Sequence, residues 1–486
     1  MTLDFTTPGY YYWFLPLAMA LYFFALRGKR DQRVVLLVAM SYLFFWMASG
    51  WHFLLLAIST CTDWIAGRRI SDSDDQTTRK RWLIASLSIN LGLLATFKYL
   101  DFIIESLNLV ALRLPSSPEI DTVGLLLPVG ISFYTFQTMS YTIDIFRGKS
   151  KPYQRFHDFA CYASFFPQLV AGPIVRSHEF LDQIENPKEF SMSRARLGIT
   201  LIVYGLFKKM VIADNVALHV NSIFSEGAAL DNTALVWWGA LCFGIQIYCD
   251  FSGYTDIALG SAHLLGVELP ENFRTPYAAT SPRDFWRRWH ISLSTWLRDY
   301  LYIPLGGSRN GNRAMAIALM ATMLLGGLWH GASWNFVFWG FLHGLLLLAN
   351  RSLSSSNPIA SAFSRFPRTM TAASWLCTQY SVFLTWLVFR IEDNDMLFRS
   401  MKSFVGWDCY WDIDELVGSL PYIKITTGVM VAGFAILHLS SGYVGGGKYW
   451  LARRHPLAWG AICGMMVFLC IVMRPSEAVD FIYFRF

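Results

Sequence analysis

Among the residues that could do chemistry, His330 is the most informative. It lies in the run 324–334, with long apolar stretches on both sides. A titratable imidazole is costly at membrane depth, so such a residue marks a functional site by default. As a helix, the apolar run 314–328 before it would span roughly 22 Å, against a hydrocarbon layer about 30 Å thick. We therefore expect the ring to lie below the membrane surface, inside the protein. A neutral imidazole there can act as a general base; the alternative is a core histidine bonded to a carbonyl.

A second histidine, His290, lies in the segment 284–300, which is rich in tryptophan and arginine. The apolar residues of this segment recur at helical spacing, which predicts one continuous amphipathic helix. A polar ring on its apolar face needs a hydrogen-bond partner. Two interpretations stay open: an interfacial helix with arginines at lipid headgroups, or a helix that lines a cavity and binds phosphates. The expected apolar stripe consists of Trp286, Trp289, His290, Leu293, Leu297 and Tyr300.

Two carboxylates, Asp250 and Asp256, lie within a third apolar run. Charged side chains cannot face lipid there, so we expect them to pair with arginines such as Arg274, Arg287 or Arg298. A buried ion-pair network that fixes helix positions is the favoured interpretation, and substrate binding is the alternative. The candidates for binding a substrate or its donor are Arg287, Arg288, Arg298, Trp289, Trp329, Asp250, Tyr254 and Asp256.

The elements that position these residues are predicted to be membrane helices. The chain has 486 residues, of which 54% are hydrophobic and only 15% charged, against roughly 25% charged residues in soluble domains. Continuous apolar runs, rather than alternating ones, predict an all-α polytopic membrane protein with about 11–12 transmembrane helices. The predicted spans are 10–26, 34–48, 52–67, 82–98, 123–146, 197–219, 234–265, 314–329, 334–350, 371–390, 423–440 and 456–473.

Charge and cysteine content narrow the class of protein further. The net charge of +6 reflects basic loops that the positive-inside rule assigns to the cytoplasm, and does not indicate nucleic-acid binding. Eight scattered cysteines lack zinc-site spacing, so we expect no metal site.

The apolar segments 156–184 and 284–307 are interrupted or semi-polar, which predicts re-entrant or interfacial pieces. We expect one membrane domain over residues 1–486, with two lobes meeting at Gly306–Gly307.

Long motifs give the chain a resemblance to a known family. The run 285–294, the following 299–302 and 305–307, and the run Leu328–Ala332 resemble the membrane-bound O-acyltransferase family. The nearest branch is the bacterial alginate O-acetyltransferases, and the similarity covers nearly the whole chain, with most motifs in about 124–350. Further motifs that carry the resemblance are 127–134, 166–173, 250–256, 272–277 and 481–484.

The resemblance implies a fold and a reaction. It implies a ring of transmembrane helices around a thinned centre, crossed by a central tunnel, in a multi-pass protein of the bacterial inner membrane. His330 matches the catalytic histidine of the family, and His290 matches its other recurring histidine. The run 305–309 favours the branch that acetylates polysaccharides.

The implied reaction moves an acetyl group from a cytoplasmic donor, such as acetyl-coenzyme A, to an extracytoplasmic polysaccharide that is alginate-like. The co-substrate is the acyl donor, and no bound cofactor is expected. The implied partners are a periplasmic acetyltransferase or other polysaccharide-modifying proteins, with membrane lipids around the chain. The alternatives are transfer of an acyl or D-alanyl group to peptidoglycan or another envelope polymer.

A second class of function is a transporter for protons or a polar solute, because intramembrane histidines also serve proton relays. Transporter folds often contain paired, broken repeats, and the sequence shows none.

Overall fold

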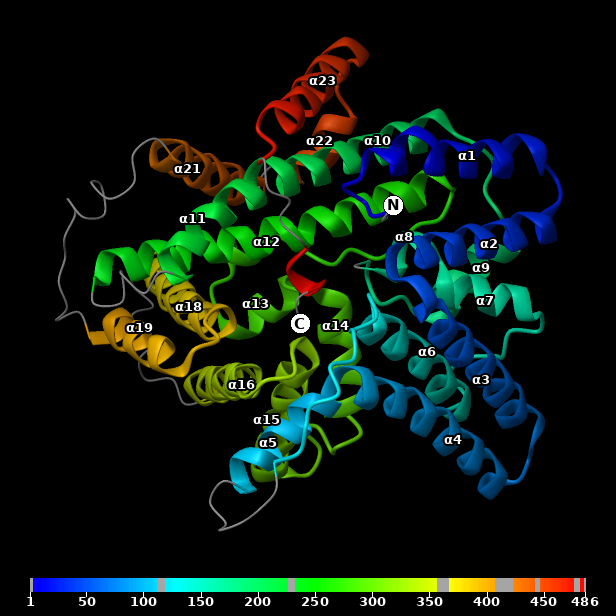
Figure 1. The fold of residues 1–486 in the computed structure, drawn as a ribbon, viewed down its shortest axis with the longest axis horizontal. Coiled ribbons are helices and arrows are strands. Elements are labelled where there is room, and N and C mark those ends of the chain that lie inside the picture. Colours follow the sequence, from blue (N-terminus) through cyan, green and yellow to red (C-terminus); the bar gives the residue numbers. More distant parts are fainter. Residues whose placement is uncertain are drawn as a thin grey trace. The chain divides into compact units, whose positions relative to one another are not determined.

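The computed structural model consists of helices and their connections (Figure 1). It describes residues 3–111, 119–170, 172–225, 232–355, 367–406, 423–441, 446–475 and 481–484. None of these residues forms a β-strand. The predicted all-α fold class is therefore confirmed.

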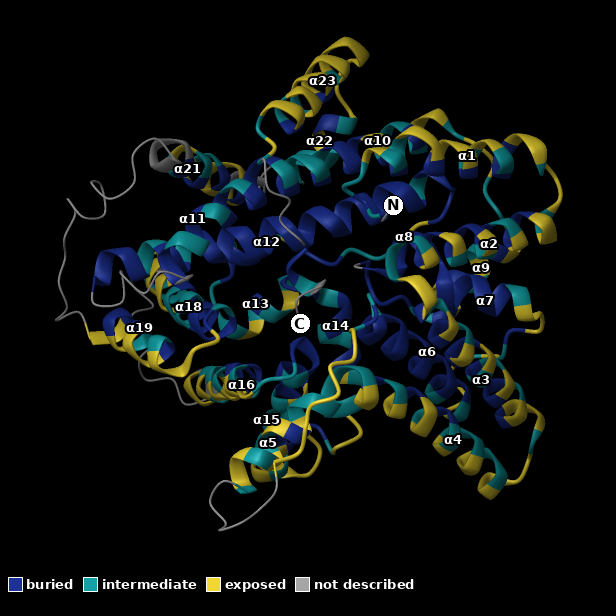
Figure 2. Ribbon diagram, viewed as in Figure 1, coloured by how far each residue is buried: buried dark blue, intermediate teal, exposed yellow. Residues whose placement is uncertain are grey.

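Several helices are suited to a bilayer. Six helical stretches are long and apolar enough to cross a membrane, and three shorter apolar helices accompany them. Leu457 and Ile471, on one of the shorter helices, are 79% and 72% exposed, and exposed residues predominate there (α23 in Figure 2). The chain is a multi-pass membrane protein. The six stretches are Arg30–Asp72, Gln76–Ala111, Thr233–Leu264, Gly311–His330, Trp334–Leu353 and Arg368–Arg390, and the shorter helices are Tyr10–Ala25, Thr427–Leu439 and Pro456–Val472.

Two predicted spans differ from the structure. The span 123–146 is helical only from Ile131, because Pro128 and Gly130, which has a left-handed φ of 71°, precede the helix α6 (Ile131–Phe146). The span 197–219 is not among the membrane candidates. It is divided by the π-helix η5 (Phe207–Ala213), which carries two buried lysines.

The segments predicted to be re-entrant or interfacial form short helices. The segment 156–184 contains α7 (Phe156–Ser164), α8 (Phe166–Leu169) and the start of α9 (Ser177–Glu185). The segment 284–307 contains most of α13 (Pro282–Arg288), then α14 (Ile291–Leu297) and the π-helix η7 (Arg298–Tyr302).

The chain packs as two compact units. The first comprises Met1–Ile202 and Ile257–Pro270, and the second comprises Val203–Asp256 and Glu271–Phe486. Gly306 and Gly307 lie inside the second unit, so the predicted boundary between two lobes was wrong. Two long helices, α10 (Met192–Leu206) and α12 (Thr233–Leu264), contribute residues to both units.

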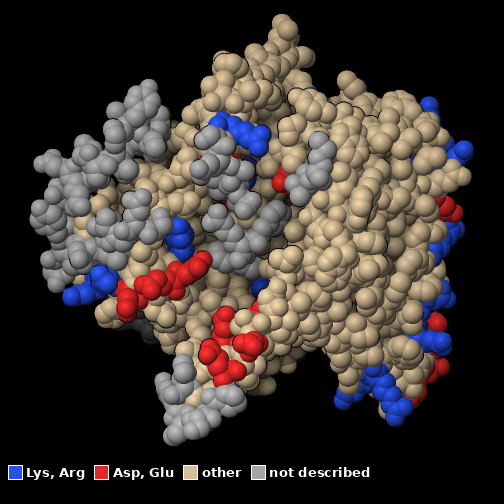
Figure 3. All heavy atoms as spheres, viewed as in Figure 1, with Lys and Arg blue, Asp and Glu red and all other residues tan. Residues whose placement is uncertain are grey.

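A buried polar network connects three helices of the first unit. The Asp63 carboxylate accepts hydrogen bonds from Ser86 Oγ at 2.6 Å and Asn90 Nδ2 at 2.9 Å, and Ser86 Oγ also lies 3.1 Å from Thr142 Oγ1. On the face of this unit in Figure 3, charged side chains gather along one edge and leave a wide uncharged surface. Its main helices are η1 (Tyr10–Phe14), α1 (Leu15–Ala20), η2 (Leu21–Ala25), α2 (Arg30–Ser49), α3 (Phe53–Asp72), α4 (Gln76–Leu94), η4 (Ala95–Tyr99), α5 (Leu100–Ala111), α6, α7, α8 and α9.

The second unit carries every candidate catalytic and binding residue. The helix α15 (Gly311–His330) packs against α16 (Trp334–Ser355), which in turn packs against α13 and α18 (Pro367–Arg390). α18 packs against α19 (Asn394–Gly406). The remaining helices are η5, α11 (Asp214–Ser225), η6 (Pro276–Ala278), α21 (Ile423–Ser441), α22 (Gly447–Ala452), α23 (Pro456–Val472) and η8 (Ile482–Phe484).

Candidate active site

His330 is the last residue of α15 and is only 2% exposed. Aromatic side chains surround its ring. The centroid distances are 5.0 Å to Trp339, 5.1 Å to Trp329, 5.6 Å to Phe389 and 5.7 Å to Tyr483. The predicted burial of this imidazole is confirmed, and these four ring neighbours are all aromatic.

Two glycines, Gly327 in α15 and Gly331 directly after it, bring the aromatic wall close to His330. A Cβ on Gly327 would lie 2.2 Å from the backbone oxygen of Phe336, and one on Gly331 would lie 2.0 Å from the Phe336 ring. Small residues allow membrane helices to approach this closely. The glycines therefore let α16 pack against α15, which places Trp339 beside His330.

Replacing Gly327 with alanine is expected to separate α15 from α16. Because the obstructing atom belongs to the backbone, we expect a loss of about 1–3 kcal/mol of stability, the usual effect of overpacking. Thermal unfolding of the purified variant in detergent measures it. Gly464→Ala is the matched control, since a Cβ on Gly464 meets nothing within 4 Å. Equal melting temperatures for the two variants would contradict the prediction.

His290 lies between two helices and not within one, so the prediction of a continuous helix over 284–300 was wrong. α13 ends at Arg288, and His290 has a left-handed backbone with φ 43°. The cause is non-local: the Ile291 N–H donates to the Asn272 carbonyl at 2.9 Å, and the Ser292 N–H donates to Asn272 Oδ1 at 3.2 Å. These bonds replace the ones that would have continued the helix.

This break turns the two histidines toward each other. The His290 ring is fully buried, with its centroid 4.8 Å from Phe251, 5.5 Å from Trp329 and 6.3 Å from His330. Burial lowers the pKa of His290 to about 3, so its imidazole stays neutral at physiological pH. A neutral imidazole has one donor and one acceptor, which suits the orientation of a hydroxyl or carbonyl group.

Substitutions at His290 should separate the roles of its ring and its backbone. Asparagine tolerates the left-handed conformation, whereas a β-branched residue pays a penalty of roughly 1–2 kcal/mol. We expect His290→Asn to fold and to lose part of its activity, and His290→Val to lose melting temperature as well. Measuring melting temperature and acyl transfer for both variants tests this. A valine variant as stable as the asparagine variant would contradict it.

The three arginines predicted to bind the donor belong to the segment 284–300, where two of them have acidic partners and the third is exposed to solvent. Arg287 is exposed. Arg288 Nε lies 2.9 Å from Asp284 Oδ1, and Arg298 Nε lies 2.8 Å from Asp299 Oδ1. Their role in donor binding stays a prediction.

The predicted tryptophans are both buried, and one of them, Trp329, lies beside the two histidines. The Trp289 ring packs 5.1 Å from Phe273 and 5.0 Å from Trp386, and Trp329 touches both His290 and His330. Trp329 therefore contributes to the wall of the site directly, and Trp289 supports it from behind Phe273.

The buried carboxylates pair with lysines, so the predicted arginine partners were wrong. Asp256 lies 2.6 Å from Lys208 and 2.7 Å from Lys448, and Asp250 lies 2.8 Å from Lys209. Arg274 pairs with Glu271 instead. The favoured interpretation, a buried ion-pair network, is confirmed.

The lysine partners and Asp214 were missed from the sequence. Lys209 bridges Asp250 and Asp214, at 2.8 and 2.7 Å. A signal was present: Lys208 and Lys209 are adjacent in an apolar run, and buried ammonium groups require acidic partners. The remaining candidate, Tyr254, packs its ring 4.2 Å from Phe481.

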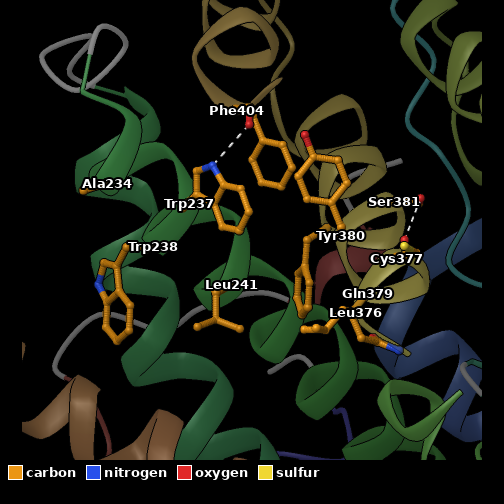
Figure 4. Close-up of a pocket in the computed structure, with 11 residues that line it drawn as sticks. Ala234, Trp237, Trp238, Leu241, Leu376, Cys377, Gln379, Tyr380, Ser381 and Phe404 are labelled. Atoms are coloured by element: carbon orange, nitrogen blue, oxygen red, sulfur yellow. Dashed lines mark hydrogen bonds between the residues drawn. The ribbon is translucent and has the colours of Figure 1, made fainter. Parts of the chain in front are cut away.

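A separate apolar pocket of about 890 Å³ lies among α12, α18 and α19. In Figure 4, Trp237, Tyr380 and Phe404 face it from these three helices. Neither histidine lines it, so it is distinct from the histidine site. Among the described residues, no three His, Cys, Asp or Glu side chains gather as a metal site.

Comparisons with known proteins agree with the geometry. The model of the membrane-bound O-acyltransferase family matches residues 119–393, more than half of the chain. A probable alginate O-acetylase of Pseudomonas aeruginosa is 37% identical over 89% of the chain and 80% of that relative. A peptidoglycan O-acetyltransferase of Helicobacter pylori is 34% identical over 83% of the chain and 80% of that relative.

A more distant relative is the teichoic acid D-alanyltransferase of Bacillus subtilis, 29% identical over 45% of the chain and 58% of that relative. All these relatives are named for group transfer, and none for transport, so the comparisons favour an enzyme over the transporter hypothesis. The family match spans both buried histidines and the helices that bring them together. The chain belongs to the membrane-bound O-acyltransferase family and is an O-acyltransferase.

Proposed function

We propose that the enzyme transfers an acetyl group from a cytoplasmic donor, across the bacterial inner membrane, to an extracytoplasmic polysaccharide of the alginate type. The observation that carries this proposal is a pair of buried histidines enclosed by aromatic rings, one of which, His330, ends a membrane helix. The alginate O-acetylase relatives supply the substrate class.

His330 is the general base in this proposal. One ring nitrogen takes the proton of an acceptor hydroxyl, and the hydroxyl oxygen attacks the thioester carbonyl carbon of the donor. The new C–O bond forms, the C–S bond breaks, and the imidazolium returns its proton to the departing sulfur. His290 orients the reacting groups, and the aromatic walls keep water from the thioester.

The donor is acetyl-coenzyme A or another cytoplasmic acetyl thioester. Arg287, Arg288 and Arg298 are proposed to bind its anionic groups, because guanidinium groups match phosphate geometry. The acceptor hydroxyl belongs either to the sugar or to a periplasmic acetyltransferase that completes the transfer. The tunnel implied by the family resemblance would join donor and acceptor at His330.

Other envelope polymers are the alternative acceptors. The peptidoglycan O-acetyltransferase of Helicobacter pylori covers nearly as much of the chain as the alginate relatives, so peptidoglycan is the second candidate. The D-alanyltransferase match covers under half of the chain, and D-alanyl transfer is therefore less supported.

Reconstitution tests the proposal. The full chain in proteoliposomes would receive acetyl-coenzyme A, labelled in its acetyl group, on one side and de-acetylated alginate or peptidoglycan fragments on the other. We expect free thiol to appear together with labelled ester on alginate, with a periplasmic acetyltransferase added if transfer is relayed. Thiol release with label only on peptidoglycan would replace the acceptor, and no thiol release would refute the donor.

A further inference from the structure

We propose that Asp250 is a positioning residue that holds the segment 481–484 against His330. The proposal rests on the proposed catalytic role of His330. The bond that carries it runs from the Ile482 backbone N–H to Asp250 Oδ2, at 2.7 Å and between buried groups. It joins α12 to a segment more than two hundred residues later in the chain.

The Asp250 carboxylate is fixed on both of its oxygens. Oδ1 lies 2.8 Å from Lys209 Nζ, while Oδ2 accepts the Ile482 N–H. Lys209 is itself held by Asp214 Oδ1 at 2.7 Å. Asp250 and Lys209 are 2% and 1% exposed, so the charge-assisted bonds act in a medium of low dielectric constant, where they are strong. The carboxylate is therefore a rigid anchor.

The anchored segment packs on the same face of α12. The Phe481 ring, 1% exposed, lies 4.2 Å from Tyr254, and the Tyr483 ring lies 4.5 Å from Phe251. The helix η8 within this segment is only three residues long. Such a short 3₁₀ turn has little stability of its own, so contacts with α12 must hold it.

Holding this segment places a side chain on the catalytic ring. Tyr483 lies 5.7 Å from His330 between centroids. Its hydroxyl oxygen is buried and has no hydrogen-bond partner among the described residues. Without the Asp250 bond, the Tyr483 side of the histidine site would open to water or to larger molecules. Asp250 therefore acts on the site through the segment and does not touch the reacting atoms.

A neighbouring ion network provides a matched control. Asp256 lies on the same helix, is 3% exposed, and forms ion pairs with Lys208 and Lys448. It resembles Asp250 in charge and burial, and its ion-pair partners are also lysines. Neither of its two ion pairs involves the segment 481–484. Loss of Asp256 therefore reports the general effect of breaking a buried ion network in this unit.

The test measures access to His330 and not catalysis. The full chain in detergent is treated with diethylpyrocarbonate, and mass spectrometry gives the rate of modification of His330. We expect Asp250→Ala to raise this rate about tenfold, the effect of losing one charge-assisted hydrogen bond. Asp250→Asn should raise it less, because its amide oxygen can still accept the Ile482 N–H. Asp256→Ala should leave the rate within about twofold of wild type.

Ile482→Pro provides a test that leaves the buried ion network intact. Proline removes the N–H that donates to Asp250, whereas the matched Ile482→Val keeps it. We expect the proline variant alone to expose His330. Combining Asp250→Ala with Tyr483→Ala should give no faster modification than Tyr483→Ala, because both act on the same segment.

Equal rates for Asp250→Ala and Asp256→Ala, or for the proline and valine variants, would overturn the proposal. These readouts need no substrate. If the acyl-transfer assay failed while His330 access still depended on Asp250, the proposed function would be wrong and the positioning role would stand.

Discussion

His330→Ala is expected to reduce acyl transfer severely, with kcat/KM falling by about two to four decades. The ring lies in an aromatic enclosure and is only 2% exposed, so another general base cannot easily replace it. Removing it also leaves a small cavity between α15 and α16, which we expect to lower the melting temperature slightly. The assay is release of free thiol from acetyl-coenzyme A by purified enzyme in proteoliposomes.

His343→Ala is the matched control for this prediction. His343 is 1% exposed, lies on α16 and contacts the same Trp339, at 4.5 Å between centroids. Its Nε2 lies 3.1 Å from Thr385 Oγ1, as expected for a structural histidine. We expect it to retain activity within about tenfold of wild type after correction for folded protein, since it lacks the role of a general base. Equal losses at both positions would refute the assignment of His330.

Lys209→Met is expected to destabilise the second unit strongly. Lys209 forms ion pairs with two buried carboxylates, Asp250 and Asp214, and both would lose that ion pair. Removing one partner of a buried pair usually reduces stability by about 3–5 kcal/mol. We expect little folded protein in the membrane fraction and a large drop in melting temperature in detergent.

Two further variants make the Lys209 prediction specific. Adding Asp214→Asn to Lys209→Met removes one of the two carboxylates that Lys209 pairs with, and it should recover part of the melting temperature. Lys188→Met breaks an exposed pair with Glu268 and should change stability by no more than about 1 kcal/mol. If the Lys209 and Lys188 variants melted alike, the buried network would not be stabilising as inferred.

The sequence predicted the membrane helices and the burial of His330 well, because both depend on local patterns. An apolar run of about 20 residues predicts a span wherever it occurs, and α15 ends at His330 as its apolar run suggests. The motif residues around His330 also carried the family resemblance. These signals lie within a few residues of one another, so a single sequence contains them.

The break at His290 could not be predicted in the same way. The spacing of residues 284–300 suits a helix, and what ends that helix is the segment at Asn272, which takes the hydrogen bonds of Ile291 and Ser292. Similarly, the partner of Asp256 at Lys448 lies 192 residues away in the chain. The charge of the aspartates predicted that they have buried partners of opposite charge. Which lysine pairs with which carboxylate is determined by the packing of helices that are distant in the sequence.

Because His330 is the last residue of α15, the length of this helix determines where the imidazole lies. From Gly311 to His330 the chain advances one fixed step per residue, about 1.5 Å with a rotation of roughly 100°. Deleting a single residue within α15 would shift the imidazole of His330 along the helix axis. It would also rotate this ring about the axis, away from the ring of His290. Insertions and deletions should therefore be tolerated in the connection before α15 and not within the helix, whatever the residue types involved.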